Sequence, residues 1–133
     1  MIDPKFLSAG KTIYKLYHGY NFTPLIDNLK LNAWTLVTFY QHSGSLRLFF
    51  VNENNPYEKL IIIERYRQAK KMRELEVSVY RNESTDYVSF PYHRQKVIIS
   101  DYFQKVDSLY KIDLEKILTA VTELKRRLNE NLE

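Results

Sequence analysis

The sequence contains no cysteine and has little glycine, proline or tryptophan. There are 3 Gly, 4 Pro and 1 Trp in 133 residues. Without cysteine the chain can form no disulfide, no thiol nucleophile and no zinc site with sulfur ligands. So few Gly and Pro exclude a collagen-like or low-complexity chain. We therefore expect a single folded domain over residues 1–133, because single domains commonly contain about 100–150 residues.

Long apolar runs are also missing. The longest purely aliphatic run, residues 60–63, is far shorter than the roughly 20 residues that cross a bilayer. Residues 1–6 are not followed by an apolar run, so they do not have the pattern of a signal peptide. Together with the lack of cysteine, these observations predict a cytoplasmic, intracellular protein with no membrane partner.

Tyrosine is abundant and lies among basic residues. The chain has 11 Tyr and 7 Phe, a net charge of +4, and 20 basic against 16 acidic side chains. The basic residues are most concentrated in residues 65–73, which hold five cations and no acid. A local basic patch attracts polyanions, although a solvated loop or helix face is the alternative meaning of such a run. The abundant Tyr, Ile, Lys and Asn are typical of AT-rich coding, as in a microbe, virus or mobile element.

The N-terminal segment, residues 1–30, has the signals of helices. Asp3-Pro4 and Thr23-Pro24 each place a capping residue before a proline, which is favoured at the first helical position. The second start precedes Leu25, Ile26 and Leu29, which are spaced for one helix face. We expect two short helices in this segment.

The period of the sequence changes after residue 33. Alternating, β-branched and aromatic patterns predict strands over residues 34–40, 46–51, 58–66, 74–81 and 87–90. Turn-forming residues separate these runs. Residues 57–72 also suit helical spacing, and we prefer a strand that leads into a basic turn. An antiparallel sheet over residues 33–92 follows.

Residues 97–131 are predicted to be helical. Ser100 or Asp101 can cap a helix that carries Phe103, Val106 and Tyr110. Further on, apolar residues recur three and four positions apart, namely Leu114, Ile117, Val121, Leu124 and Leu128. This spacing predicts packing on the sheet. A homodimer through the C-terminal helix is a further hypothesis.

The predicted fold class is α+β. An antiparallel sheet of about five strands in hairpins would carry the N-terminal and C-terminal helices packed on one face. The other face of the sheet would then stay open to solvent or to a partner.

Enzymatic motifs are weak in this sequence. The histidines His18, His42 and His93 have neither metal-binding spacing nor a neighbouring carboxylate. Three other acids, Glu64, Glu74 and Glu76, could gather on central strands as in a metal-dependent nuclease, but their spacing is not that of a nuclease. We predict no catalytic residue, no metal and no cofactor.

The first functional hypothesis is a small non-enzymatic nucleic-acid-binding protein with little sequence specificity. Cations follow phosphates and aromatic rings stack on bases, so a basic hairpin with neighbouring rings suits single-stranded DNA or RNA. The predicted binding residues are Arg47, Phe49, Arg65, Tyr66, Arg67, Lys70, Lys71, Arg73, Tyr80 and Arg81.

The alternative is a protein–protein interaction module, such as an adaptor, an inhibitor or a chaperone-like protein. Its partner would bind the open sheet face and the C-terminal helix. The position of the aromatic rings distinguishes the two hypotheses. Rings amid Arg and Lys favour nucleic acid, whereas rings in an apolar patch favour a protein partner.

Overall fold

The computed structural model describes residues 22–42, 45–67, 69, 72–83, 91, 94–100, 102–106 and 109–130. The helix predicted from Asp3 and the strand predicted over residues 87–90 lie outside the described residues. The elements in chain order are α2 (Thr23–Leu31), β1 (Trp34–His42), β2 (Ser45–Asn52), β3 (Asn55–Arg67), β4 (Met72–Arg81), β5 (Gln95–Ile99), β6 (Phe103–Val106), β7 (Leu109–Ile112) and α3 (Leu114–Glu130).

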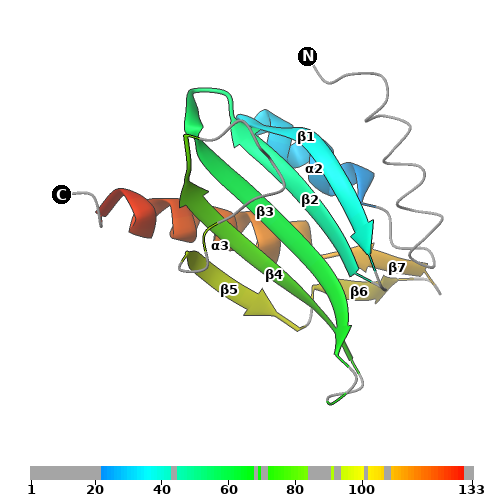
Figure 1. Ribbon diagram of the computed structural model, residues 1–133. Coiled ribbons are helices and arrows are strands. Elements are labelled where there is room, and N and C mark those ends of the chain that lie inside the picture. Colours follow the sequence, from blue (N-terminus) through cyan, green and yellow to red (C-terminus); the bar gives the residue numbers. More distant parts are fainter. Residues whose placement is uncertain are drawn as a thin grey trace.

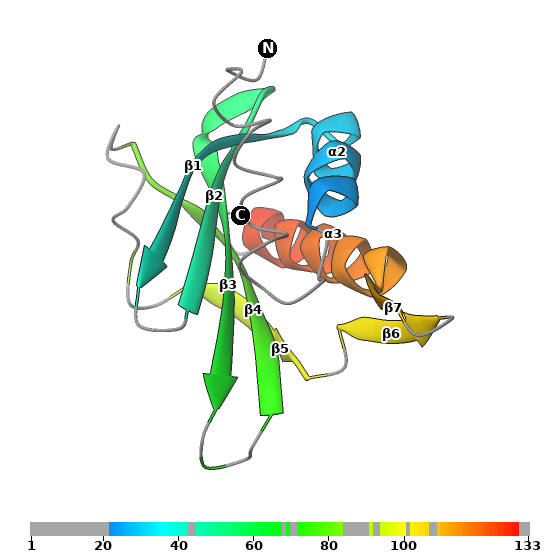
Figure 2. The same cartoon turned by 90° about the vertical axis from the view of Figure 1, so that its right-hand side faces the viewer.

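The first five strands form one antiparallel sheet in the order β1-β2-β3-β4-β5. Each strand pairs with the next strand along the chain, so the sheet is a meander. Both helices lie on the same face of this sheet (Figures 1 and 2). The predicted α+β class, the five-stranded antiparallel sheet and the helices on one face are confirmed.

The apolar run in β3 explains why residues 58–66 form a strand. Leu60 and Ile62 belong to the core cluster on the helix side of the sheet, whereas Ile61 and Ile63 belong to a second cluster. Successive side chains of a strand point to opposite faces, so a continuous apolar run is buried on both faces only in a strand. The helical alternative for this segment would have buried one side alone.

The main core lies between the sheet and the two helices. Leu25, Ile26 and Leu29 of α2 are buried there, and so are Ile117, Val121 and Leu124 of α3. The apolar residues of α3 therefore pack on the sheet of the same chain, as their spacing of three and four residues predicts.

The second face of the sheet is also buried at the centre. Phe49, Ile61, Ile63 and Tyr80 form a cluster in which no side chain is more than 4% exposed, with Val37 packed against it. The expectation of an open sheet face is wrong for these residues. The reason is that β2 and β3 carry apolar side chains on this face as well, at Phe49, Ile61 and Ile63, and such surface is buried when it can be.

Residues 95–99, 103–106 and 109–112 are strands, and the helix predicted from Ser100 or Asp101 is wrong for the described residues up to Ile112. Strand β5 extends the sheet, and β6 and β7 form a separate two-stranded hairpin. Tyr102, just before β6, is fully buried, and its hydroxyl donates a 2.8 Å hydrogen bond to Glu64 Oε1. Burial of this ring and of Ile112 favours the hairpin. Within the described part of the chain, no helix is long and apolar enough to cross a membrane.

Replacing Leu124 with alanine should lower the free energy of unfolding by about 2–5 kcal/mol, because Leu124 is 1% exposed and the change leaves a cavity under α3. The matched control is Leu31→Ala, since Leu31 is 84% exposed at the end of α2. The Leu31→Ala change should lower the free energy of unfolding by no more than about 0.5 kcal/mol. Urea denaturation followed by circular dichroism measures the free energy of unfolding of both variants. Equal losses in the two variants would contradict the packing of α3 described above.

Candidate functional site

The β3–β4 hairpin extends beyond the rest of the sheet. β2 last pairs with β3 at Glu64, and β5 last pairs with β4 at Leu75. Three further pairs join β3 and β4 alone, namely Arg65 with Glu74, Tyr66 with Arg73 and Arg67 with Met72. Figure 2 shows this two-stranded ribbon projecting past the ends of the neighbouring strands. Arg65, Arg67 and Arg73 therefore lie on the projecting part of a hairpin, as the sequence pattern predicts.

Arg65, at the base of this ribbon, is bound to two glutamates of β4. Its Nη2 lies 3.7 Å from Glu74 Oε2 and donates a hydrogen bond of 3.3 Å to Glu76 Oε1. Both carboxylates are 3% exposed, and the Arg65 side chain is 26% exposed. The charge of Arg65 therefore compensates buried acids on the second face of the sheet.

Glu76 connects this pair to Arg94, which precedes β5. Arg94 Nη2 lies 2.5 Å from Glu76 Oε2, its Nε donates to Ser78 Oγ at 3.2 Å, and its Nη1 donates to the Pro91 carbonyl at 3.1 Å. The Arg94 side chain is 8% exposed. A buried ionic network therefore joins β3, β4 and the residue that leads into β5.

The two arginines control the charge state of Glu76. Burial raises the pKa of this carboxyl, but the hydrogen bond and charge of Arg94, the charge of Arg65 and the Ser78 hydroxyl together outweigh burial. The net result is a pKa below the ordinary glutamate value. Glu76 is therefore ionised at neutral pH, as its ion pairs require.

Arg81, at the other end of β4, has partners on β3 and α3. Its Nη2 lies 3.7 Å from Glu58 Oε2 and donates a 3.1 Å hydrogen bond to Asn129 Oδ1. Lys125 of α3 approaches the same carboxylate, with Nζ 3.8 Å from Glu58 Oε1. These contacts attach the end of α3 to the sheet.

The two rings predicted to stack on bases, Phe49 and Tyr80, are core residues. They are 2% and 3% exposed. Burial raises the pKa of the Tyr80 hydroxyl to about 12, against the opposing charge of Arg94. A ring at this depth presents no face to a base. The prediction that Phe49 and Tyr80 contact nucleic acid is therefore wrong, and both rings pack in the core. Cross-strand packing of rings is their structural role.

Arg47 lies on β2, opposite Tyr40 of β1 and Ile63 of β3. It is half-buried, whereas Tyr40 is 47% exposed. Tyr40 is thus an exposed ring directly opposite a cation of the sheet.

The remaining predicted residues belong to the hairpin end. The backbones of Tyr66, Arg67 and Arg73 are paired in the ribbon, but their side chains, together with Lys70 and Lys71, lie outside the described residues. Arg73 and Arg81 stand eight residues apart on β4, roughly 26 Å at the usual rise of a strand. The ten predicted residues therefore do not form one continuous surface.

The acids considered for metal-dependent catalysis do not gather at one place. Glu74 and Glu76 share the second face of the sheet with their arginine partners. Glu64 lies on the opposite face, where Tyr102 donates to it. No cluster of three His, Cys, Asp or Glu residues able to hold a metal ion occurs in the described part of the chain.

Comparison with known proteins does not assign the chain to a family. No family model, no curated protein and no solved structure matched the chain. The functional argument therefore depends on the residues themselves.

Replacing Glu76 with glutamine should lower the free energy of unfolding at pH 7 by roughly 3 kcal/mol, because Arg94 then stays buried without its carboxylate. The folded-state pKa of Glu76 is depressed, so the contribution of this group is present above the ordinary glutamate pKa and is lost as pH falls through the folded-state value. The difference between wild type and variant should therefore narrow below about pH 4. Denaturation at several pH values measures this difference.

The matched control is Glu123→Gln on α3. Glu123 also pairs with an arginine, Arg126, but the two side chains are 41% and 54% exposed. Its removal should change stability little, since exposed ion pairs contribute little. A Glu76 variant as stable as the Glu123 variant at pH 7 would show that the buried network is not what stabilises this face.

Proposed function

We propose that this protein binds single-stranded DNA or RNA, without enzymatic activity and with little sequence specificity, through the end of the β3–β4 hairpin. The observation that carries the proposal is the projection of this ribbon beyond β2 and β5, with Arg65, Arg67 and Arg73 on its paired strands and Lys70 and Lys71 between them in the sequence. A narrow basic ribbon can approach a phosphate backbone that a flat sheet face cannot reach.

The burial of Phe49 and Tyr80 changes the proposed mechanism. Phosphate contacts by Arg67, Lys70, Lys71 and Arg73 supply most of the affinity, since Arg65 already compensates two glutamates. Stacking is left to Tyr66, whose backbone pairs with Arg73 within the ribbon. One stacked ring among cations supports binding of unpaired bases, with phosphate contacts dominant.

Binding should be strong only at low salt. With four phosphate contacts, the slope of log K against log salt is expected to be about −3 for a single strand. Fluorescence anisotropy with labelled single-stranded DNA and RNA at about 50 and 200 mM salt measures it, and a duplex of the same sequence is the comparison. Replacing Lys70 and Lys71 with alanine should weaken binding and reduce the steepness of this slope by about 1.4.

The matched control replaces Lys30 and Lys116 with alanine. These lysines lie on α2 and α3, and their removal changes the net charge by the same amount. Equal weakening by both double variants would mean that only net charge matters. No binding at about 50 mM salt would contradict the proposal, because phosphate contacts are strongest there.

The interaction-module alternative has less support in the geometry. The second sheet face is buried at Phe49, Ile61, Ile63 and Tyr80, and the apolar side of α3 packs on its own sheet. Among the described residues, the large exposed apolar side chains are those of Leu31, Tyr40, Tyr57 and Ile98, which lie on four different elements. A homodimer through α3 would have to use its polar side, and sedimentation of the purified protein measures the oligomeric state.

A further inference from the structure

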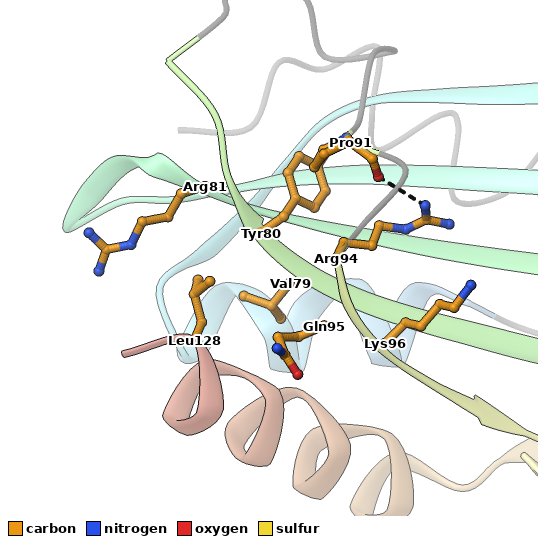
Figure 3. Close-up of a pocket in the computed structure, with 8 residues that line it drawn as sticks. All are labelled: Val79, Tyr80, Arg81, Pro91, Arg94, Gln95, Lys96 and Leu128. Carbon is orange, nitrogen blue, oxygen red and sulfur yellow. Dashed lines mark hydrogen bonds between the residues drawn. The ribbon is translucent and has the colours of Figure 1, made fainter. Parts of the chain in front are cut away.

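A pocket of about 580 Å³ lies where the pairing of β4 and β5 ends. The last pair of these strands is Val79 with Gln95, and β4 continues past it through Tyr80 and Arg81. Leu128, near the end of α3, closes one side of the pocket. Figure 3 shows these residues around the corner between the sheet and α3. The volume is in the range of small-molecule sites, which is about 300–1,000 Å³.

The charged residues described in the lining of this pocket are all basic. It contains Arg81, Arg94 and Lys96, and no Asp or Glu among the described residues that line it. The glutamates that pair with the two arginines, Glu58 and Glu76, are buried and lie outside the lining. A cleft lined by one sign of charge concentrates ions of the opposite sign.

The ion pairs around the pocket do not cancel its positive charge. Arg81 and Lys125 share the single carboxylate of Glu58. The other two arginines, Arg65 and Arg94, are balanced by Glu74 and Glu76. Lys96 is exposed and forms no ion pair with any described residue. Among the described residues, the group of Arg81, Lys125 and Glu58 thus carries one net positive charge, and Lys96 carries another.

Arg94 is held in place before any ligand arrives. Its guanidinium bonds to Glu76, Ser78 and the Pro91 carbonyl fix the side chain, and its exposure is only 8%. Figure 3 shows Lys96 extending to the same side of β5 as Arg94, whereas Arg81 extends away from both. Glu76 already compensates the charge of Arg94, so the exposed Lys96 is the side chain able to meet an anion.

We propose that this pocket binds a small phosphate-bearing molecule, with its phosphate at Lys96. A phosphate carries close to two negative charges at neutral pH, which suits a lining whose described charged residues are all basic. Lysine is a common phosphate ligand because it acts as a point charge. The pocket lies at the opposite end of β4 from the basic ribbon, so this site is independent of the proposed nucleic-acid binding.

The test is a titration of the full chain with pyrophosphate and with adenosine monophosphate, followed by amide NMR at constant ionic strength. Saturable shifts are expected at Arg81, Gln95 and Lys96, and sodium chloride alone should not produce them. The variant Lys96→Gln should weaken binding about tenfold, because it removes a charge-assisted contact at an exposed position that does not affect folding.

The matched control is Lys30→Gln on α2, which contacts β1 at the opposite edge of the sheet. It should bind both ligands like the wild type. Chemical shifts that do not saturate, or equal weakening of ligand binding in the two variants, would contradict the proposed site.

The Lys70→Ala, Lys71→Ala double variant should still bind pyrophosphate, and Lys96→Gln should still bind oligonucleotide. Loss of oligonucleotide binding in Lys96→Gln would show instead that the pocket is part of the nucleic-acid surface.

Discussion

The burial of both faces of β3 is the constraint on which the rest of this structure depends. Leu60 and Ile62 pack beneath the helices, while Ile61 and Ile63 pack with Phe49 and Tyr80 on the other side. A strand that is apolar on both faces is stable only in the interior of a sheet, with partners on both edges. The meander supplies these partners as β2 and β4. The tip of the β3–β4 pair projects because β2 and β5 end earlier.

The buried second face also decides what the charged residues do. β4 places Glu74, Glu76 and Ser78 on that face, where an unpaired carboxylate would be strongly unfavourable. Arg65 and Arg94 compensate them, so two cations that seem suited to an anionic partner already serve the fold. The two anion sites that we propose therefore use other cations, those of the ribbon end and Lys96 beside β5.

Local patterns were sufficient for most of the sheet and for the last helix. Alternation predicted β1 to β4, and the spacing of three and four residues predicted the apolar side of α3. The pattern failed over residues 97–112, because Phe103, Val106 and Tyr110 suit helical spacing although they lie in strands. The hairpin there is favoured by burial of Tyr102 against Glu64, which is 38 residues away in the sequence. Phe49 and Tyr80 were misjudged for the same reason, since aromatic composition does not reveal exposure.

The sequence by itself determined the α+β class, the β3–β4 hairpin and the concentration of cations at residues 65–73, because each follows from neighbouring residues and their periodicity. Only the tertiary structure decided which cations are available and which rings are buried. The partners concerned are distant in the chain, since Glu76 is 11 residues from Arg65 and 18 from Arg94, and Arg81 is 48 residues from Asn129. Ion pairing and burial depend on distance in space, and the packing of the strands sets that distance.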